Sequence, residues 1–350
     1  MKKLVLAGLL LAGLLGANAQ NVASTTTLTS GGNLAGTVGT GTYYGSQAGK
    51  ISTGTLNTFI GTSAGLSNTT GGSNLFSGHL AGSQNTTGSS NVYLGRSAGN
   101  SNTTGAYNTI TGFNAGSNSG CQLAVCTTTG TNNSFYGASS GIINNGGNEN
   151  AFFGSSAGAK NTTGNNNTYL GFSAGSNNAG TGNVFLGSNA GPSANQAGSS
   201  LSNNLFIDNS INSTPLIWGD FALNQLKLNG TVGIGAVTTF PTNVAYTNYR
   251  LFVTGGILSD EVTVKLSASG TWADYVFAND YKLKPLSEVE AFITKNKHLP
   301  NVPSASEVKE NGINVADMAR IQQEKIEELT LYIIAQNKRI EALESKMSNK

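Results

Sequence analysis

Residues 57–73 read Asn-Thr-Phe-Ile-Gly-Thr-Ser-Ala-Gly-Leu-Ser-Asn-Thr-Thr-Gly-Gly-Ser, and variants of this stretch recur through residues 41–208. The leading asparagine, the first glycine and the alanine each return every 17 residues before an insertion interrupts the register. The leading asparagines of this part are Asn57, Asn74, Asn91 and Asn108. A fixed period of this kind is typical of stacked structural units and not of a catalytic motif.

A large apolar residue precedes each repeat glycine by two positions. Stacked coils place equivalent residues above one another at the strand spacing, roughly 4.8 Å. We therefore expect this column to form the core of the repeat region. Its clearest members are Phe59, Phe76, Tyr93, Phe135, Phe152, Tyr169 and Phe185.

The glycine and β-branched content of every repeat excludes a helix. Residues 41–208 are predicted to form a parallel β-roll or β-solenoid of about ten coils, with alanine inward, glycine at corners and asparagine in amide ladders. One coil has only about three or four apolar side chains to bury, which makes a thin core. Two arrangements remain open. Either three copies pack side by side, or one chain forms a β-helix with the aromatic column as its own interior.

The beginning of the chain has the pattern of a signal peptide. Lys2 and Lys3 precede an apolar run at 4–15, which is followed by Ala17-Asn18-Ala19. The run is too short for a transmembrane helix, so we expect residues 1–19 to be removed after Ala19. Export to the cell surface or the medium follows from this prediction. Residues 20–40 lack the repeat register and are expected to be a lead-in.

The repeat region is almost free of charge. Between residues 20 and 207 the charged side chains are Lys50, Arg96, Glu149 and Lys160. General acid–base catalysis, metal binding and nucleophile activation need clustered titratable groups, and nucleic-acid binding needs a basic surface. We expect a non-enzymatic region with no cofactor, no metal site and no nucleic-acid partner. His79 is expected to be a lone surface side chain.

Cys121 and Cys126 both lie in the insertion that follows Gly116. In an exported protein two nearby cysteines are expected to form a disulfide, here closing a loop, with free thiols as the alternative. A metal site would need further ligands, and no His, Asp or Glu is nearby in the sequence. Ice binding by threonine rows is a further alternative for the solenoid. Adjacent pairs such as Thr69-Thr70 disfavour it, because neighbouring strand residues point to opposite faces.

Residues 209–280 are predicted to form a small β neck, because charged residues become frequent from Asp208 onward. A hairpin is expected at 226–234 with Asn229-Gly230 as its turn. The other predicted neck features are strands at 249–253 and 261–266 and a core containing Trp218 and Trp272.

The last part of the chain is predicted to be helical. Residues 281–314 form a connector with a helix at 286–295, and Ser304 with Glu307 makes a capping-box pattern for the next segment. Residues 315–350 have heptad spacing, which favours a coiled coil over a helix packed on its own domain. The heptads alone do not separate two strands from three. The expected contact residues are Ile326, Leu329, Ile333, Gln336, Ile340, Leu343 and Met347.

Two parts of the chain resemble known families. The repeats at 57–65 and 91–99, each followed by Asn-Thr-Thr-Gly, resemble the head repeats of trimeric autotransporter adhesins, although the period is longer here. That resemblance implies a β-roll made of three chains. The sequences at 229–235, 272–277, 298–304 and 325–332 resemble the ends of tail-fibre-like surface proteins of Bacteroidetes.

The end region is also similar in layout to the intramolecular chaperone domain of phage tail spikes, a self-cleaving family. That family has a nucleophilic serine before an aspartate, whereas here Asn279 precedes Asp280. Self-cleavage is therefore expected to be absent. Ser259-Asp260, with Lys265 nearby, is a weaker alternative nucleophile.

These observations predict an exported, non-enzymatic, adhesin-like surface fibre, a homotrimer assembled by its C-terminal coiled coil. The expected partners are other copies of the chain and a glycan or host-matrix surface. Trimeric autotransporters end in membrane-spanning strands, whereas this sequence ends in a polar helix, so direct membrane insertion is not expected. A phage-derived fibre with a chaperone or self-processing domain is the main alternative, and ice binding is a lower one.

Overall fold

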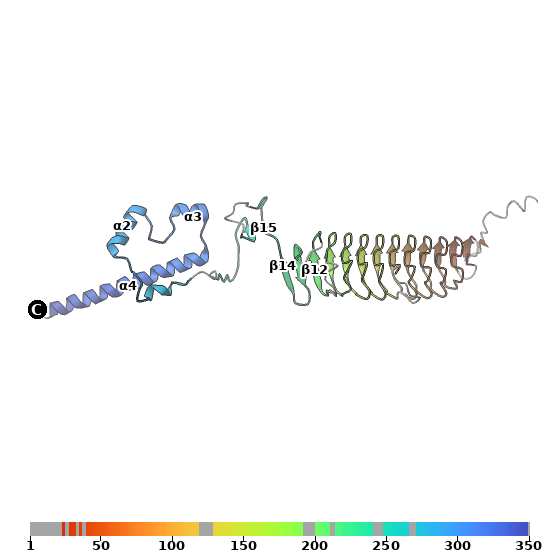
Figure 1. Cartoon of the computed structure of the whole chain (residues 1–350), viewed down its shortest axis with the longest axis horizontal. Helices are drawn as coiled ribbons and strands as arrows, with labels where there is room; N and C mark the ends of the chain where they lie inside the picture. The colour runs from red at the N-terminus through yellow and green to blue at the C-terminus, as the bar shows by residue number, and fades with distance from the viewer. Residues whose placement is uncertain are drawn as a thin grey trace, which may run out of the picture. The chain divides into compact units, whose positions relative to one another are not determined.

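The computed structural model divides the chain into two units, Met1–Gly255 and Gly256–Lys350. The first unit contains a long solenoid and the second contains the helices (Figure 1). The structure describes residues 23–24, 28–32, 35–36, 40–118, 129–191, 200–210, 214–240, 248–265 and 271–348. The predicted signal peptide and Cys121 and Cys126 lie outside these residues.

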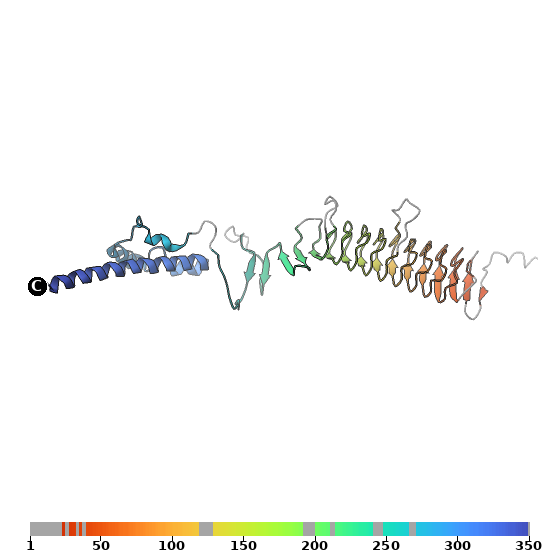
Figure 2. The ribbon, with the colours of Figure 1, turned by 90° about the horizontal axis from the view of Figure 1, so that it is seen from below.

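The repeat region forms a parallel β-solenoid of about 11 turns, which confirms the predicted β-solenoid. Each coil contributes one short strand, and these strands follow one another along the solenoid (Figure 2). The parallel strands are β2 (Leu28–Gly31), β3 (Gly41–Tyr44), β4 (Asn57–Ile60), β5 (Leu75–Ser77), β6 (Val92–Leu94), β7 (Thr109–Thr111), β8 (Ser134–Tyr136), β9 (Ala151–Phe153), β10 (Thr168–Leu170), β11 (Val184–Leu186) and β12 (Asn204–Ile207). The solenoid starts earlier than the repeat register indicates, because β2, which lies in the predicted lead-in, pairs in parallel with β3. A short strand β1 (Ala23–Ser24) pairs antiparallel with β2.

The aromatic column is the interior of a single chain. Neighbouring rings stack directly, with 4.8 Å between the centroids of Phe59 and Phe76 and 4.7 Å between those of Phe76 and Tyr93. The alanine column is also buried. Of the two arrangements left open by the sequence, the structure therefore shows the second, in which the column is the interior of one chain. The column itself gives no reason to pack three copies together. At most 1% of each side chain is exposed for Phe59, Phe76, Tyr93, Phe135, Phe152, Tyr169 and Phe185.

Asparagine ladders fill the polar half of the interior. The backbone N–H of Asn91 donates to Asn74 Oδ1 at 2.9 Å, and Asn91 Nδ2 donates to the Gly105 carbonyl at 2.9 Å. A second ladder runs beside it, with Asn102 Nδ2 donating to Asn85 Oδ1 at 3.0 Å. Buried amides need such partners, because an unsatisfied polar group inside a protein costs free energy. The narrow coil has few apolar side chains to bury, and hydrogen bonds that repeat at every turn stabilise the rest of its interior.

The C-terminal end of the solenoid is closed by an antiparallel hairpin. Strand β13 (Ile217–Asp220) pairs with β12, and β14 (Gln225–Leu228) pairs with β13. Trp218 lies opposite Phe206 and packs, partly buried, on the end of the core. Asp220 Oδ1 accepts hydrogen bonds from the backbone N–H groups of Ala222 and Leu223, which fixes the turn.

The predicted hairpin at Asn229-Gly230 is wrong. Strand β14 ends before this turn and pairs backward with β13, while β15 (Val232–Ile234) pairs in parallel with β16 (Leu251–Val253). The open edge of β12 explains the difference, because antiparallel pairing with β13 satisfies its backbone groups and extends the sheet to β14. The strand expected at 261–266 is not formed at 261–265, and residue 266 lies outside the described part.

The second unit consists of η2 (Ala273–Phe277), α2 (Leu286–Asn296), α3 (Ala305–Asn311) and α4 (Val315–Ser348). The predicted helix at 286–295 and the capping box are confirmed, since Ser304 Oγ accepts from the Glu307 N–H and Glu307 Oε2 accepts from the Ser304 N–H. The expected neck core is wrong at Trp272, which is 45% exposed, whereas Ala273 and Val276 are buried. Within the described residues, no helix has both the length and the apolar character needed to cross a membrane.

Candidate assembly site

The predicted heptad residues form one stripe along α4, called the seam below. The helix has 34 residues and is therefore about 51 Å long at about 1.5 Å per residue. The apolar side chains of the seam are between 52% and 78% exposed, and a large exposed apolar patch commonly marks an interaction site. Gln336 is also exposed within the stripe. The apolar members are Ile326, Leu329, Ile333, Ile340, Leu343 and Met347.

A different side of α4 is used for contacts within its own unit. Tyr275 of η2 donates a hydrogen bond to Glu324, and Tyr281 Oη donates to Glu328 Oε1 at 2.5 Å. Asn301 Nδ2 donates to Glu324 Oε1 at 3.2 Å. These contacts leave the seam exposed. α4 therefore has one face anchored in its own unit and another available to a partner.

Lys325 completes a charged cluster beside the seam. Its Nζ lies 2.8 Å from Glu324 Oε1 and 2.8 Å from Glu328 Oε2. Burial raises the pKa of Glu324, but hydrogen bonds from Lys325, Tyr275 and Asn301 and the Lys325 charge outweigh it, so the pKa lies below its ordinary value. Burial lowers the pKa of Lys325, and the two glutamates raise it by more. Arg320 Nη1 also lies 3.6 Å from Glu324 Oε2, so two cations and two carboxylates offset one another in this cluster.

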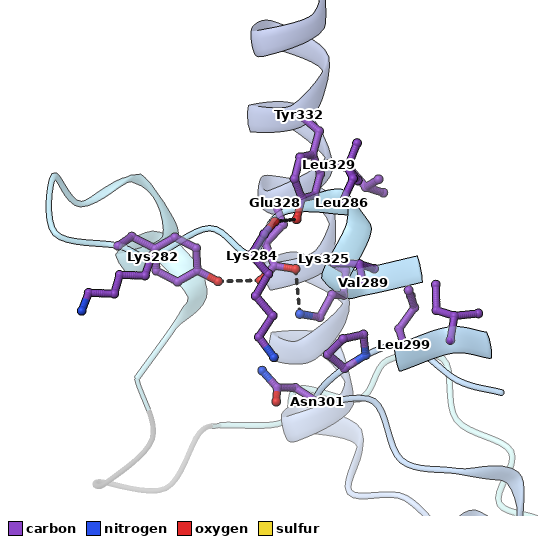
Figure 3. A pocket seen from close by; sticks show the side chains of 13 residues that line it. Lys282, Lys284, Leu286, Val289, Leu299, Asn301, Lys325, Glu328, Leu329 and Tyr332 are labelled. Carbon is purple, nitrogen blue, oxygen red and sulfur yellow. Dashed lines mark hydrogen bonds and ion pairs between the residues drawn. The ribbon is translucent and has the colours of Figure 1, made fainter. Parts of the chain in front are cut away.

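Two hollows border the N-terminal part of the seam. One, of about 270 Å³, lies between α2 and α4 and is lined by Leu286, Val289, Leu329 and Tyr332 among others (Figure 3). The other, of about 350 Å³, is lined by Met318, Ile321 and Ile326. Leu299 lines both hollows. Ile326 and Leu329, the first two members of the seam, thus each form part of a hollow.

The solenoid offers a second exposed surface, the outer side of its strands. The residue after each core aromatic points outward, because strand side chains alternate. Tyr136 and Phe153 in this row stack on each other at 4.8 Å with their planes only 9° apart. Their ring faces cover one another, so the edges face outward. None of the ten row positions is charged; they are Tyr44, Ile60, Ser77, Leu94, Thr111, Tyr136, Phe153, Leu170, Leu186 and Ile207.

The alternative nucleophile has no catalytic arrangement in the described residues. Ser259 Oγ donates to the Glu261 carbonyl at 2.7 Å, and no hydrogen bond joins Ser259 to Lys265 in the described part of the chain. No group of three or more His, Cys, Asp or Glu side chains that could hold a metal ion occurs among the residues described.

The tyrosine–glutamate contacts were not found by sequence reasoning. Tyr275 is 49 residues from Glu324, and Tyr281 is 47 residues from Glu328. One signal was available, since Glu324 and Glu328 are four residues apart and must therefore lie on one side of a helix. This signal is weak, because charged residues outside an apolar seam usually face solvent.

Comparisons with protein-family models, with curated proteins and with solved structures found no match to this chain.

Proposed function

We propose that the chain is an exported, non-enzymatic surface fibre protein that assembles as a parallel homotrimer through α4. The observation that carries the proposal is the seam, whose six apolar side chains are more than half exposed although the helix is anchored elsewhere in its unit. Burying such side chains against identical ones would stabilise the assembly by about 25 cal/mol for each Å² of apolar surface removed from water. The role of the fibre is adhesive or structural.

The charges beside the seam favour parallel strands. Residues Lys325, Arg339 and Lys346 occupy heptad position g, and Glu344 occupies position e. In a parallel coiled coil, position g faces position e of the next heptad in the neighbouring helix, so Arg339 would face Glu344 of another copy. An antiparallel pair would instead bring the cationic g positions together.

One observation favours two strands over three. Position a holds Ile326, Ile333 and Ile340, while position d holds Leu329 and Leu343. In parallel coiled coils, isoleucine at a with leucine at d favours dimers. The trimer in our proposal is supported by the resemblance of the repeats to trimeric heads, and the measured mass of the assembly separates the two copy numbers.

Substitutions in the seam test the assembly. Ile340→Asp places a charge among apolar side chains and is expected to weaken association at least about tenfold, which corresponds to about 1.4 kcal/mol. Ala335→Asp, at an exposed position outside the seam, is the matched control and should leave association unchanged. Sedimentation equilibrium of both variants measures the effect. Equal association of the two variants would contradict assembly through the seam.

An adhesive role would place a glycan or matrix ligand on the nearly neutral solenoid, whose coils present Asn, Ser and Thr. The stacked Tyr136 and Phe153 expose ring edges, whereas sugars pack on ring faces, so this pair supports a structural or protein contact more than a sugar platform. Glycan and host-matrix arrays test the adhesive part. Binding to either supports adhesion, and an oligomer that binds neither supports a purely structural fibre.

Self-processing is the alternative, and the residues oppose it, because Asn279 occupies the place of the expected nucleophile. A single full-length band of the mature protein on a denaturing gel is the expected result. Two fragments separated near Ser259 would favour the self-processing alternative.

A further inference from the structure

Helix α2 exposes much of its apolar side. Leu286, Val289 and Ile293 recur at spacings of three and four, which places them on one face of the helix. Leu286 is 49% exposed, Ile293 is 39% exposed, and no residue of α2 is buried. The hollow of about 270 Å³ separates part of this face from α4. Within one chain, α2 therefore leaves apolar surface uncovered beside α4.

The segment 299–302 holds an apolar ridge in place beside the seam. Pro300 is buried, and Asn301 is hydrogen-bonded to Glu324 of α4. Leu299 is nevertheless 42% exposed and lines both hollows. The hollows on the two sides of this fixed ridge have the form into which the side chains of a packed helix insert.

We infer that α4 of a second copy packs on α2 and Leu299 of its neighbour as well as on the seam, an inference that rests on the proposed assembly. Continuity of the surface identifies the occupant. Ile326 lines one hollow and Leu329 the other, so a helix seated on these two residues also reaches the hollow walls. Lys325 and Glu328 lie on the wall and pair with each other. Lys282 and Lys284 also line the hollow between α2 and α4, so the part that suits apolar side chains is the side formed by Leu286, Val289, Ile293, Leu299 and Leu329.

The N-terminal and C-terminal parts of the seam therefore differ in what they contact on the neighbouring copy. Near Ile326 and Leu329, the contact between copies includes α2 and the ridge of the neighbouring chain. From Ile340 onward the same helix has only exposed residues around the seam and forms a simple coiled coil. The second copy would cover Leu286, Ile293 and Leu299, which are among the apolar side chains that a single chain leaves exposed.

Cross-linking between isotopically distinct copies tests this contact directly. Leu299→p-benzoylphenylalanine is introduced into the full chain, and ¹⁴N- and ¹⁵N-labelled chains are unfolded together, reassembled and irradiated. Mass spectrometry should show links to residues 318–333 of α4 that join a light chain to a heavy chain. The same probe at Ala291, an exposed position on the opposite side of α2, is the control and should give no such links.

Light scattering on the same samples separates the inference from the proposed function. An oligomer with mixed-isotope links supports the inference. An oligomer that gives only same-isotope links, or no links to α4, overturns the inference and leaves assembly through the seam in place. A mass of one chain overturns both.

A pair of charge substitutions provides an independent readout. Ile293→Asp is expected to weaken association about tenfold, while Ala291→Asp on the other side of the same helix should change it by less than about twofold. Circular dichroism checks that both variants keep the helix content of the native protein. Equal association of the two folded variants would contradict the contact.

Discussion

At the residue scale, one asparagine per ladder performs several tasks. The side-chain oxygen of Asn91 accepts from the backbone N–H of Asn108 at 2.9 Å, and its amide group donates to the Gly105 carbonyl. The side chain is fully buried. A single side chain thus links its own coil to the next coil and to a corner of the chain, which explains why this residue type returns with each repeat.

Replacing this residue should be costly. Asn91→Ala leaves the buried Asn108 N–H without its partner, whereas the Gly105 carbonyl still accepts from Asn102 Nδ2 at 2.9 Å. One unsatisfied buried group costs about 1–3 kcal/mol, so we expect a loss of roughly 1–3 kcal/mol in the free energy of unfolding of the solenoid. Trp218, packed at the end of the core, reports this transition by fluorescence during urea unfolding. Gln84→Ala, at an exposed position, is the control, and equal losses would contradict the role of the ladder.

Corner glycines are required by close contact between coils. Gly154 has a φ of 138°, and a Cβ placed there would lie 2.2 Å from the carbonyl oxygen of Gly171. Gly146 does not have a positive φ in this range, and among the described residues a Cβ there would have one neighbour within 4 Å, at 3.8 Å. Gly154→Ala should therefore destabilise the solenoid by more than about 2 kcal/mol, while Gly146→Ala should be nearly neutral. Thermal unfolding of the two variants compares them, and similar midpoints would be inconsistent with this explanation.

At the scale of elements, α4 combines an intrachain face and an exposed seam. The intrachain face depends on the ionised form of Glu324, because Lys325, Tyr275 and Asn301 all donate hydrogen bonds to it. Removing that charge at low pH weakens the attachment of η2 and of segment 299–302 to the helix. The position of α2 beside the seam should depend on the same contact.

This dependence has a definite sign. Glu324 has a lower pKa in the folded protein, so its contribution to stability is present above the unfolded-state pKa, about 4.3, and is lost as the pH falls through the folded value. The helical unit should therefore unfold more readily at pH 3 than at pH 6. Glu324→Gln should reduce this pH dependence. Thermal melts followed by circular dichroism at several pH values measure it, and equal pH slopes for both proteins would contradict the assignment.

Gln336 limits the stability of the seam, because it places an amide among apolar side chains at position d. Gln336→Leu should raise the melting temperature of the oligomer. It should also relax the register, which mass measurement would show as additional oligomeric species. An unchanged or lower melting temperature would place Gln336 outside the contact.

The periodic elements could be predicted from the sequence, and the pairings between distant segments could not. The 17-residue period places Phe76 above Phe59, because each coil repeats the same local geometry. No comparable signal joins β13 to β12, or Tyr275 to Glu324, since these pairs occur once. The Asn229-Gly230 turn has a hairpin sequence, yet pairing of β14 with β13 prevails over the local preference. The seam was predictable for the same reason as the solenoid, whereas the placement of α2 and Leu299 beside the seam was not.

At the scale of the whole molecule, the two units have different means of stabilisation. The solenoid buries its aromatic and asparagine columns within one chain and has few charges. The helical unit has no buried residue in α2 or α3 and exposes a long apolar seam. A unit with so little internal core is expected to need other copies for stability. Assembly is therefore proposed to reside in the second unit.

The mass of the exported chain in solution, measured by light scattering over a range of concentrations, tests this account most directly. We predict three times the mass of one chain, and we expect Ile333→Asp to reduce it toward the mass of a single chain while the solenoid stays folded. A mass of two chains would contradict the trimer and leave the seam as the contact. A folded protein that keeps the mass of one chain at every concentration would contradict assembly itself.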